Sequence, residues 1–275
     1  MIRTKPPLPF QGNKSKGKKY FMEVLHEIEH GENKIFVDLF GGSFYLSYLV
    51  HCVYPEATII CNDFDNYLER LLHIPDTNIL LSQIREICSV PKDKPIPKDI
   101  KAKIDEKIKT FSGFKDIITL SVNLIFSSRY FVELEPFLKY DYYNTMNKKG
   151  YDPSINDYIE GLTFVHCDWR ELYQEYKDKK DVVFIADPPY LGTDLGGYVS
   201  SRSWQMKDAL EVLDLLKQES FILYTSNKPG IIDVINYIQA QGVEIKPYKT
   251  KGYERGVCTK NNVGNKNGEF ILYYV

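Results

Sequence analysis

Short apolar runs, several of them followed by an acidic residue, recur along the chain and predict the strands of a buried sheet. The clearest is the run at 181–186 (DVVFIA), which is rich in β-branched residues and is followed by Asp187. Strands that are buried on both faces show this near-continuous apolar pattern, which is typical of parallel sheets. The predicted strands lie at 34–38, 58–62, 162–168, 181–186, 221–225, near Val243 and at 269–275.

Apolar positions with helical spacing separate most of these strands. They predict helices at 20–30, 44–53, 206–217 and 230–241. Strands alternating with helices indicate an α/β fold with a mostly parallel sheet.

The alternation stops between about residues 66 and 161, where only helical patterns occur. We expect helices at 66–74, 79–90, around 100–111 and at 118–134, followed by a loop or hairpin at 140–153. So long an insertion between two halves of a sheet is best interpreted as a separate subdomain. The predicted domains are therefore an α/β domain at 1–66 and 162–275 and an inserted, mostly helical domain at 67–161.

Composition and charge narrow the class of protein. With 43% hydrophobic residues the chain can bury a substantial core, and its net charge of −2 means that any polyanion must be met by local patches. Basic residues gather at 1–19 and at 246–266, and we expect a basic, mobile loop at 246–266 to favour nucleic-acid contact. The lysines at 92–109 are better explained as a solvated helix face.

Cysteine usage and hydropathy give no sign of secretion or of a membrane span. The five cysteines are odd in number and lack C-x-x-C spacing, which favours reduced thiols and a cytoplasmic location. No apolar run has the length of a span, and the first residues do not form a signal peptide. His26 and His30 are four residues apart, but without a third ligand they predict no metal site.

Two local motifs carry candidate chemistry. Asp187-Pro188-Pro189-Tyr190 follows a central strand, and its prolines stop the strand and stiffen its end. A carboxylate, a carbonyl and an aromatic ring at that place could accept hydrogen bonds from an exocyclic amine and stack on its base. The alternative is an ordinary proline turn capped by an aspartate.

The second motif is the turn Leu39-Phe40-Gly41-Gly42-Ser43, which follows the strand ending in Asp38 and precedes a helix. Such a turn lets a ligand approach the backbone, and Asp63 follows about twenty residues after the glycines, where an acid can bind a ribose. The G-x-G-x-x-G dinucleotide pattern is absent. The combination favours an adenosine-containing ligand.

Taken together, the motifs resemble those of the Dam-like (class alpha) DNA adenine-N6 methyltransferases. The matching segments, in the family's order, are PPLPFQGNKSK, FVDLFGGS, NDFD, TFVHCDWREL, DPPY, FILYTSN and NGEFILYYV. They cover most of 6–66 and 162–275, and SVNLIFSSRY resembles a helix of the family's target-recognition domain. The resemblance implies a Rossmann-like methyltransferase sheet with an antiparallel C-terminal strand, S-adenosylmethionine as cofactor and double-stranded DNA as partner.

The resemblance also assigns residues. Asp187, Pro188, Pro189 and Tyr190 would hold a flipped-out adenine, while Asp63 would bind the ribose and Asp168 the adenine of the cofactor. The implied cofactor-binding residues are Phe10, Gly12, Lys14, Asp38, Phe40, Gly41, Gly42, Ser43, Asp63, Phe64, Asp168, Trp169 and Asp187. The implied DNA-binding residues are Lys14, Arg129, Tyr198, Trp204, Lys251 and Arg255.

Other functions are also compatible with the sequence. The same turn could serve cytosine N4 or adenine in RNA, and a catalytically silent nucleic-acid-binding module could keep the fold. The target sequence cannot be predicted, because base readout depends on groove placement. A restriction-modification role would add a cognate restriction endonuclease as partner, whereas an orphan or phage role would not.

Overall fold

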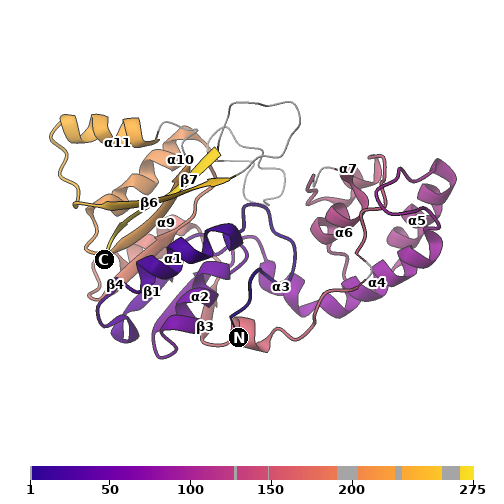
Figure 1. Cartoon of the computed structure of the whole chain (residues 1–275), viewed down its shortest axis with the longest axis horizontal. Helices are drawn as coiled ribbons and strands as arrows, with labels where there is room; N and C mark the ends of the chain where they lie inside the picture. The colour runs from indigo at the N-terminus through magenta and orange to yellow at the C-terminus, as the bar shows by residue number, and fades with distance from the viewer. Residues whose placement is uncertain (1, 127–128, 148, 191–203, 227–230, 256–266) are drawn as a thin grey trace.

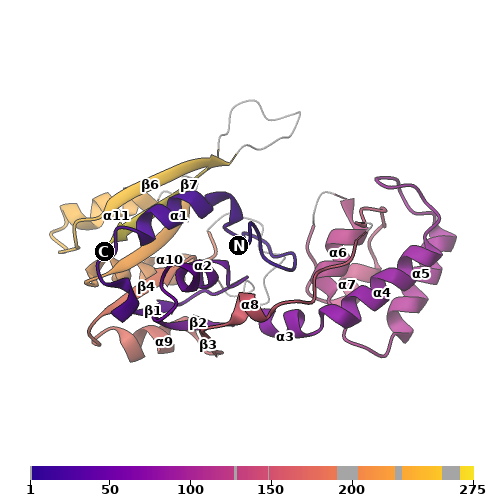
Figure 2. The same cartoon turned by 60° about the horizontal axis from the view of Figure 1, so that its bottom comes forward.

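The computed structural model describes residues 2–126, 129–147, 149–190, 204–226, 231–255 and 267–275. An α/β body and a cluster of helices lie side by side, joined by α3 (Tyr67–Leu72) and by the returning chain that contains α8 (Asn156–Ile159) (Figure 1). The N-terminal segment lies on the side of the body that faces the helical cluster (Figure 2).

One seven-stranded sheet with the order β3-β2-β1-β4-β5-β7-β6 forms the centre of the body. The pairs among β1 to β5 are parallel, and β7 runs antiparallel to both of its neighbours. This confirms the predicted mostly parallel, Rossmann-like sheet with an antiparallel C-terminal strand. The strands are β1 (Ile35–Asp38), β2 (Thr58–Asn62), β3 (Leu162–Val165), β4 (Val182–Ala186), β5 (Phe221–Ser226), β6 (Lys249–Arg255) and β7 (Asn267–Tyr274).

Helices cover both faces of this sheet, which explains why its central strands are continuously apolar. Successive side chains of a strand point to opposite faces. Phe36 accordingly joins the core under α1 (Lys18–Leu25) and α2 (Tyr45–Val53). Val37 joins the opposite core. That core is covered by α9 (Trp169–Tyr176), by the 3₁₀ helix Val212–Lys217, which directly follows α10 (Met206–Glu211), and by α11 (Ile231–Ala240).

The register brings the ends of the two central parallel strands to one edge. Asp38, the last residue of β1, pairs with Ile185 of β4, so Asp187 follows two residues later at the same edge. Open α/β sheets bind their ligands at the carboxyl ends of such strands. The acidic residues that end the predicted strands are thereby brought toward one place.

The helical insertion has a hydrophobic core of its own. It contains α4 (Ile74–Ile87), α5 (Lys98–Thr110), α6 (Ile117–Leu124) and α7 (Leu134–Leu138). Leu81, Ile104, Leu120 and Phe137 are among the residues buried there. The assignment of 67–161 as a target-recognition domain stays a prediction, since the packing says nothing about what this part binds. In the described part of the chain, no helix is long and apolar enough to cross a membrane.

Two expectations for the C-terminal part were wrong. No strand forms near Val243, which lies in an exposed turn after α11. Residues 249–255 of the expected mobile loop instead form β6, and 256–266 lie outside the described residues. The sequence KTKGYER gives no strand signal because β6 is an edge strand paired only with β7, where polar side chains reach solvent.

The helix expected at 118–134 ends at Leu124. Extended backbone begins at Ile125, and a distant segment takes over the last carbonyls of α6. The Tyr143 N–H donates to the Leu124 carbonyl at 2.8 Å, and the Thr145 N–H donates to that of Asn123 at 3.1 Å. These long-range bonds replace the i→i+4 bonds that would have continued the helix.

Candidate active site

A large open pocket lies at the carboxyl edge of the sheet and has a volume of about 920 Å³, including the space at its mouth. Most of the residues predicted to bind a cofactor line it. They are Phe10, Gly12, Lys14, Phe40, Gly41, Gly42, Ser43, Phe64, Asp168, Trp169 and Asp187, joined by Pro189 and Trp204.

The glycine turn lies against β2 so closely that a side chain would not fit. The Gly41 N–H donates to the Asn62 carbonyl at 3.1 Å, and a Cβ at Gly41 would lie 2.6 Å from Cys61 Sγ. Gly42 has φ +52°, and a Cβ there would lie 3.0 Å from the Phe10 ring. Both glycines are therefore required by the close approach of the backbone to its neighbours.

Asp38 stabilises this turn through hydrogen bonds and does not line the pocket. Its Oδ1 accepts the Phe40 N–H at 3.3 Å and its Oδ2 accepts the Ser47 hydroxyl at 2.7 Å. Burial raises the pKa of Asp38 to about 7, and the nearby negative charge of Asp187 adds to the shift, while the two hydrogen bonds oppose it.

Asp63 is also turned away from the pocket. Its two oxygens accept the N–H groups of Tyr67 at 2.6 Å and Leu68 at 3.1 Å, so the carboxylate satisfies the open N-terminus of α3. Burial raises the pKa of Asp63 to about 6. Among the described residues, the acid of this segment that lines the pocket is Asp65. The ribose-binding role of Asp63 stays a prediction.

Three aromatic rings form one wall of the pocket. The ring of Phe40 lies 5.5 Å from that of Trp169 and 5.7 Å, edge to face, from that of Trp204. The structure thus places Trp204, predicted to contact DNA, beside the residues predicted to bind cofactor. Both indole Nε1 atoms are buried and have no hydrogen-bond partner within the described chain. The rings of the wall can stack on a flat ligand ring.

Arg170 joins the aromatic wall to α10, a contact that no sequence motif predicted. Its guanidinium contacts the carboxylates of Asp168 at 3.2 Å, Glu211 at 2.6 Å and Asp208. Asp168 also caps α9 by accepting the Arg170 N–H at 2.8 Å. Arg170 and Asp208 both line the pocket. No short-range pattern could have found this cluster, because 38 and 41 positions separate Arg170 from its partners on α10.

The carboxylate of Asp187 holds the ammonium group of Lys14 at the other end of the pocket. Lys14 Nζ lies 2.6 Å from Asp187 Oδ2 and donates to the Gly12 carbonyl at 2.7 Å. It lies over the rings of Tyr190, at 5.3 Å, and Tyr224, at 5.5 Å. The Tyr190 hydroxyl donates to Asp187 Oδ1 at 3.1 Å. Burial raises the pKa of Asp187, and the positive charge of Lys14 opposes that shift.

A smaller, mostly apolar pocket lies behind the proline turn. Pro188, Pro189, Tyr190 and Tyr224 line it together with residues of α10, the following 3₁₀ helix and β5. Pro189 lines both pockets, so the Asp187–Tyr190 turn separates a large hollow from a small one.

Of the residues predicted to contact DNA, Lys14 and Trp204 line the large pocket, whereas Lys251 and Arg129 have partners elsewhere. Lys251 makes ion pairs with Glu27 at 2.9 Å and Glu23 at 3.4 Å, both on the α1 side of the body. Arg129, in the insertion, packs its guanidinium 5.2 Å from the Tyr140 ring centre. Arg255 ends β6 and Tyr198 lies outside the described residues. Their DNA contacts stay predictions.

Comparison with known proteins identifies the family. No protein-family model matches the chain. A protein of Haemophilus influenzae, provisionally named a methyltransferase, is 35% identical over 238 residues, which are 85% of this chain and 79% of the relative. The chain belongs to this methyltransferase family.

Two solved structures also align with the methyltransferase over most of its length. One is a precorrin-6y C5,15-methyltransferase from Geobacter metallireducens, 9% identical, covering 99% of this chain and 100% of that one, with a TM-score of 0.38. The other is a human methyltransferase 10 domain containing protein, 8% identical, covering 94% and 81%, with a TM-score of 0.39. Likeness at this level carries no argument about substrate.

Proposed function

We propose that this methyltransferase transfers the methyl group of S-adenosylmethionine to N6 of a flipped-out adenine in DNA. The observation that carries the proposal is the position of the Lys14 ammonium group. A nitrogen donor lies against Asp187 and over the Tyr190 ring, which is the arrangement that the exocyclic amine of a base would need. The choice of adenine in DNA rests on the resemblance of the motifs.

The large pocket has the features that the cofactor requires. Its aromatic wall offers ring faces on which the adenine of the cofactor can stack. The glycine turn presents backbone at the opposite side, and Asp65 supplies a carboxylate for ribose hydroxyls. S-adenosylmethionine carries its methyl group on a sulfonium sulfur. The amine nitrogen would form a bond to the methyl carbon as the carbon–sulfur bond breaks, which leaves S-adenosylhomocysteine.

The proline turn would make the exocyclic amine of the target base a better nucleophile. The lone pair of an exocyclic amine is delocalised into its ring, so acceptors that pull its N–H groups out of plane make it a better nucleophile. Asp187 and the Pro188 carbonyl are such acceptors, and Asp187 would also stabilise the positive charge that grows on nitrogen. The small pocket beside Tyr190 offers apolar surface for the base. The proton leaves the methylated nitrogen for solvent after transfer.

Methylation in living cells tests the proposal. The chain would be produced in a bacterial strain that lacks adenine methylation, and its genome then read by modification-sensitive sequencing. We expect N6-methyladenine in one short sequence motif, absent when the Asp187→Ala variant is produced instead.

The alternatives give distinct results in the same experiment. Cytosine N4 methylation, or methylated RNA with unmodified DNA, would identify the base or the nucleic acid and contradict the proposed substrate. A genome and RNA without modification, from cells containing folded protein, would indicate a silent nucleic-acid-binding module. A motif shared with a neighbouring nuclease gene would indicate a restriction endonuclease as partner.

A further inference from the structure

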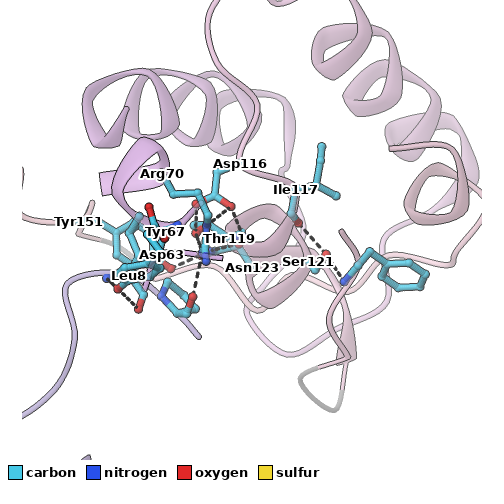
Figure 3. A network of polar contacts seen from close by, with 12 residues as sticks. Leu8, Asp63, Tyr67, Arg70, Asp116, Ile117, Thr119, Ser121, Asn123 and Tyr151 are labelled. Atoms are coloured by element: carbon cyan, nitrogen blue, oxygen red, sulfur yellow. Dashed lines mark hydrogen bonds and ion pairs between the residues drawn. The ribbon is translucent and has the colours of Figure 1, made fainter. Parts of the chain in front are cut away.

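A buried arginine joins the helical insertion to the N-terminal arm, residues 2–17, that forms part of the pocket wall. Arg70 lies on α3 and is only 5% exposed. Its Nε donates to Asp116 Oδ1 at 3.0 Å, and its Nη2 donates to the Pro9 carbonyl at 2.8 Å. Figure 3 shows the guanidinium group between α3 and the start of α6. One side chain thus contacts two segments that are far apart in sequence.

On the side of the insertion, Arg70 contacts a carboxylate that is itself held in place by the start of α6. Asp116 is 3% exposed and caps α6 by accepting the Thr119 N–H at 3.0 Å and the Thr119 hydroxyl at 2.6 Å. Because the ends of a helix need such partners, the carboxylate cannot turn away from α6 without leaving its N–H groups unsatisfied. Arg70 is therefore bonded to the insertion through the first turn of α6.

On the pocket side, the contact fixes the segment that carries Phe10 and Lys14. The neighbouring Tyr67 hydroxyl bonds both the N–H and the carbonyl of Leu8, at 3.1 and 3.0 Å, and its ring packs edge to face on Phe10. Asn13 closes the next turn by donating to the Phe10 carbonyl at 3.0 Å. Lys14 follows directly and reaches Asp187. The position of Pro9 thus sets that of two pocket residues.

We propose that Arg70 is a positioning residue, which holds the N-terminal arm in the pocket wall and makes the arm's position depend on the helical insertion. Only arginine can do this with one side chain, because its separate N–H groups point to different acceptors, whereas a lysine presents a single ammonium. The inference rests on contacts within the chain and goes beyond the proposed substrate. Of its two tests, only the binding test uses a ligand of the proposed cofactor's class and so rests on the proposed function.

Two substitutions separate the two contacts. Arg70→Lys keeps a cation beside Asp116 but cannot also reach Pro9. Asp116→Asn keeps an acceptor for the α6 cap but removes the charge that holds Arg70. None of the three hydrogen bonds that the Asp116 carboxylate accepts in the described chain comes from the arm. Asp105→Asn is the matched control, since Asp105 pairs with Lys101 at 2.6 Å within α5, inside the insertion.

Hydrogen exchange of the backbone amides measures the arm without any ligand. We expect exchange in residues 8–17 to be about tenfold faster in Arg70→Lys and Asp116→Asn than in the wild type or Asp105→Asn, with exchange in α2 unchanged. A purely structural role would instead raise exchange throughout the insertion and lower the unfolding temperature in proportion. Unchanged exchange in residues 8–17 of either variant would overturn the proposal.

Binding of S-adenosylhomocysteine gives the second readout. The chain has two tryptophans, Trp169 and Trp204, and both line the pocket, so quenching of their fluorescence reports directly on its occupation. We expect about tenfold weaker binding in both variants and wild-type affinity in Asp105→Asn. Wild-type protein that does not bind this probe would contradict the proposed cofactor, and the exchange measurement would then decide the role of Arg70 alone.

Discussion

Lys14 and Asp187 form an ion pair at 2.6 Å in which the lysine is 4% exposed, so the ammonium group is held inside the site rather than at its surface. The pair has two consequences. The positive charge of Lys14 opposes the rise in the pKa of Asp187 that burial causes. The pair also places a nitrogen donor where the proposed mechanism places the amine of the target base, so Lys14 must leave Asp187 when a base enters.

Removing the charge of Lys14 should move the pH dependence of methyl transfer. Burial raises the pKa of Asp187 and the positive charge of Lys14 opposes this rise, so Lys14→Met should raise the pKa further. The carboxylate would then form only at higher pH, and the acidic limb of the rate profile should move upward. Lys14→Arg should restore it, and the exposed Lys16→Met is the control. A profile that does not move in Lys14→Met would contradict this account of the pair.

Asp63 should contribute to the stability of the fold, whereas Asp65 should contribute to cofactor binding. Asp63→Ala removes the cap of α3 and should cost about 1 kcal/mol of stability in urea unfolding. Asp65→Ala should weaken S-adenosylhomocysteine binding roughly tenfold, as loss of a hydrogen bond from a charged group does. If Asp63→Ala were the variant that lost affinity while fully folded, the ribose acid would be Asp63, as the motif resemblance implies.

Trp204 should contribute to binding of the cofactor rather than to binding of DNA. Its ring packs edge to face on Phe40 in the wall of the large pocket. Trp204→Ala should weaken S-adenosylhomocysteine binding roughly tenfold by calorimetry, because an aromatic contact of this kind contributes about 1 kcal/mol beyond its buried area. Trp204→Phe should retain most of the affinity. Loss of DNA binding with unchanged affinity for the cofactor analogue would reverse the assignment.

Glu27 should stabilise the C-terminal hairpin in a pH-dependent way. Its carboxylate accepts from Lys249 at 2.8 Å, Lys251 at 2.9 Å and Tyr273, and these bonds lower its pKa to about 2. Since the folded-state pKa is depressed, the stabilisation is present above the ordinary value and is lost as pH falls from about 4.5 toward 2.

The variant Glu27→Gln should therefore be less stable than the wild type by about 1 kcal/mol at pH 7, allowing for screening of a partly exposed group. The difference should shrink at pH 3, as measured by urea unfolding at both values. The exposed Glu29→Gln is the control. A difference that stayed constant between the two pH values would show that packing, rather than charge, accounts for the effect.

The sequence predicted the central strands because burial on both faces leaves a direct mark on residue type. The run at 182–186 is fully buried, and the acid-ended strands do lie at one edge. The edge strand β6 was missed because it is half solvated and its polar residues obey no burial pattern. The end of α6 was missed because bonds from residues 143–145, far along the chain, terminate it.

The sequence predicted which residues lie at the candidate site but not where their side chains point. Most of the residues of the motifs line one pocket. Asp38, however, accepts from the Phe40 N–H and the Ser47 hydroxyl, and Asp63 accepts from backbone N–H groups of α3. A motif fixes where a side chain leaves the backbone, whereas its partner depends on local competition for hydrogen bonds. Arg170 has partners on a helix that follows much later in the chain, which no local pattern could reveal.

Methyl transfer in a purified system tests the central claim most directly. Unmethylated genomic DNA would be incubated with the protein and S-adenosylmethionine carrying a labelled methyl group, and then digested to nucleosides. The account predicts label in N6-methyladenine, and no label with Asp187→Ala, although that variant still binds S-adenosylhomocysteine. Label in any other nucleoside, or undiminished transfer by Asp187→Ala, would contradict it.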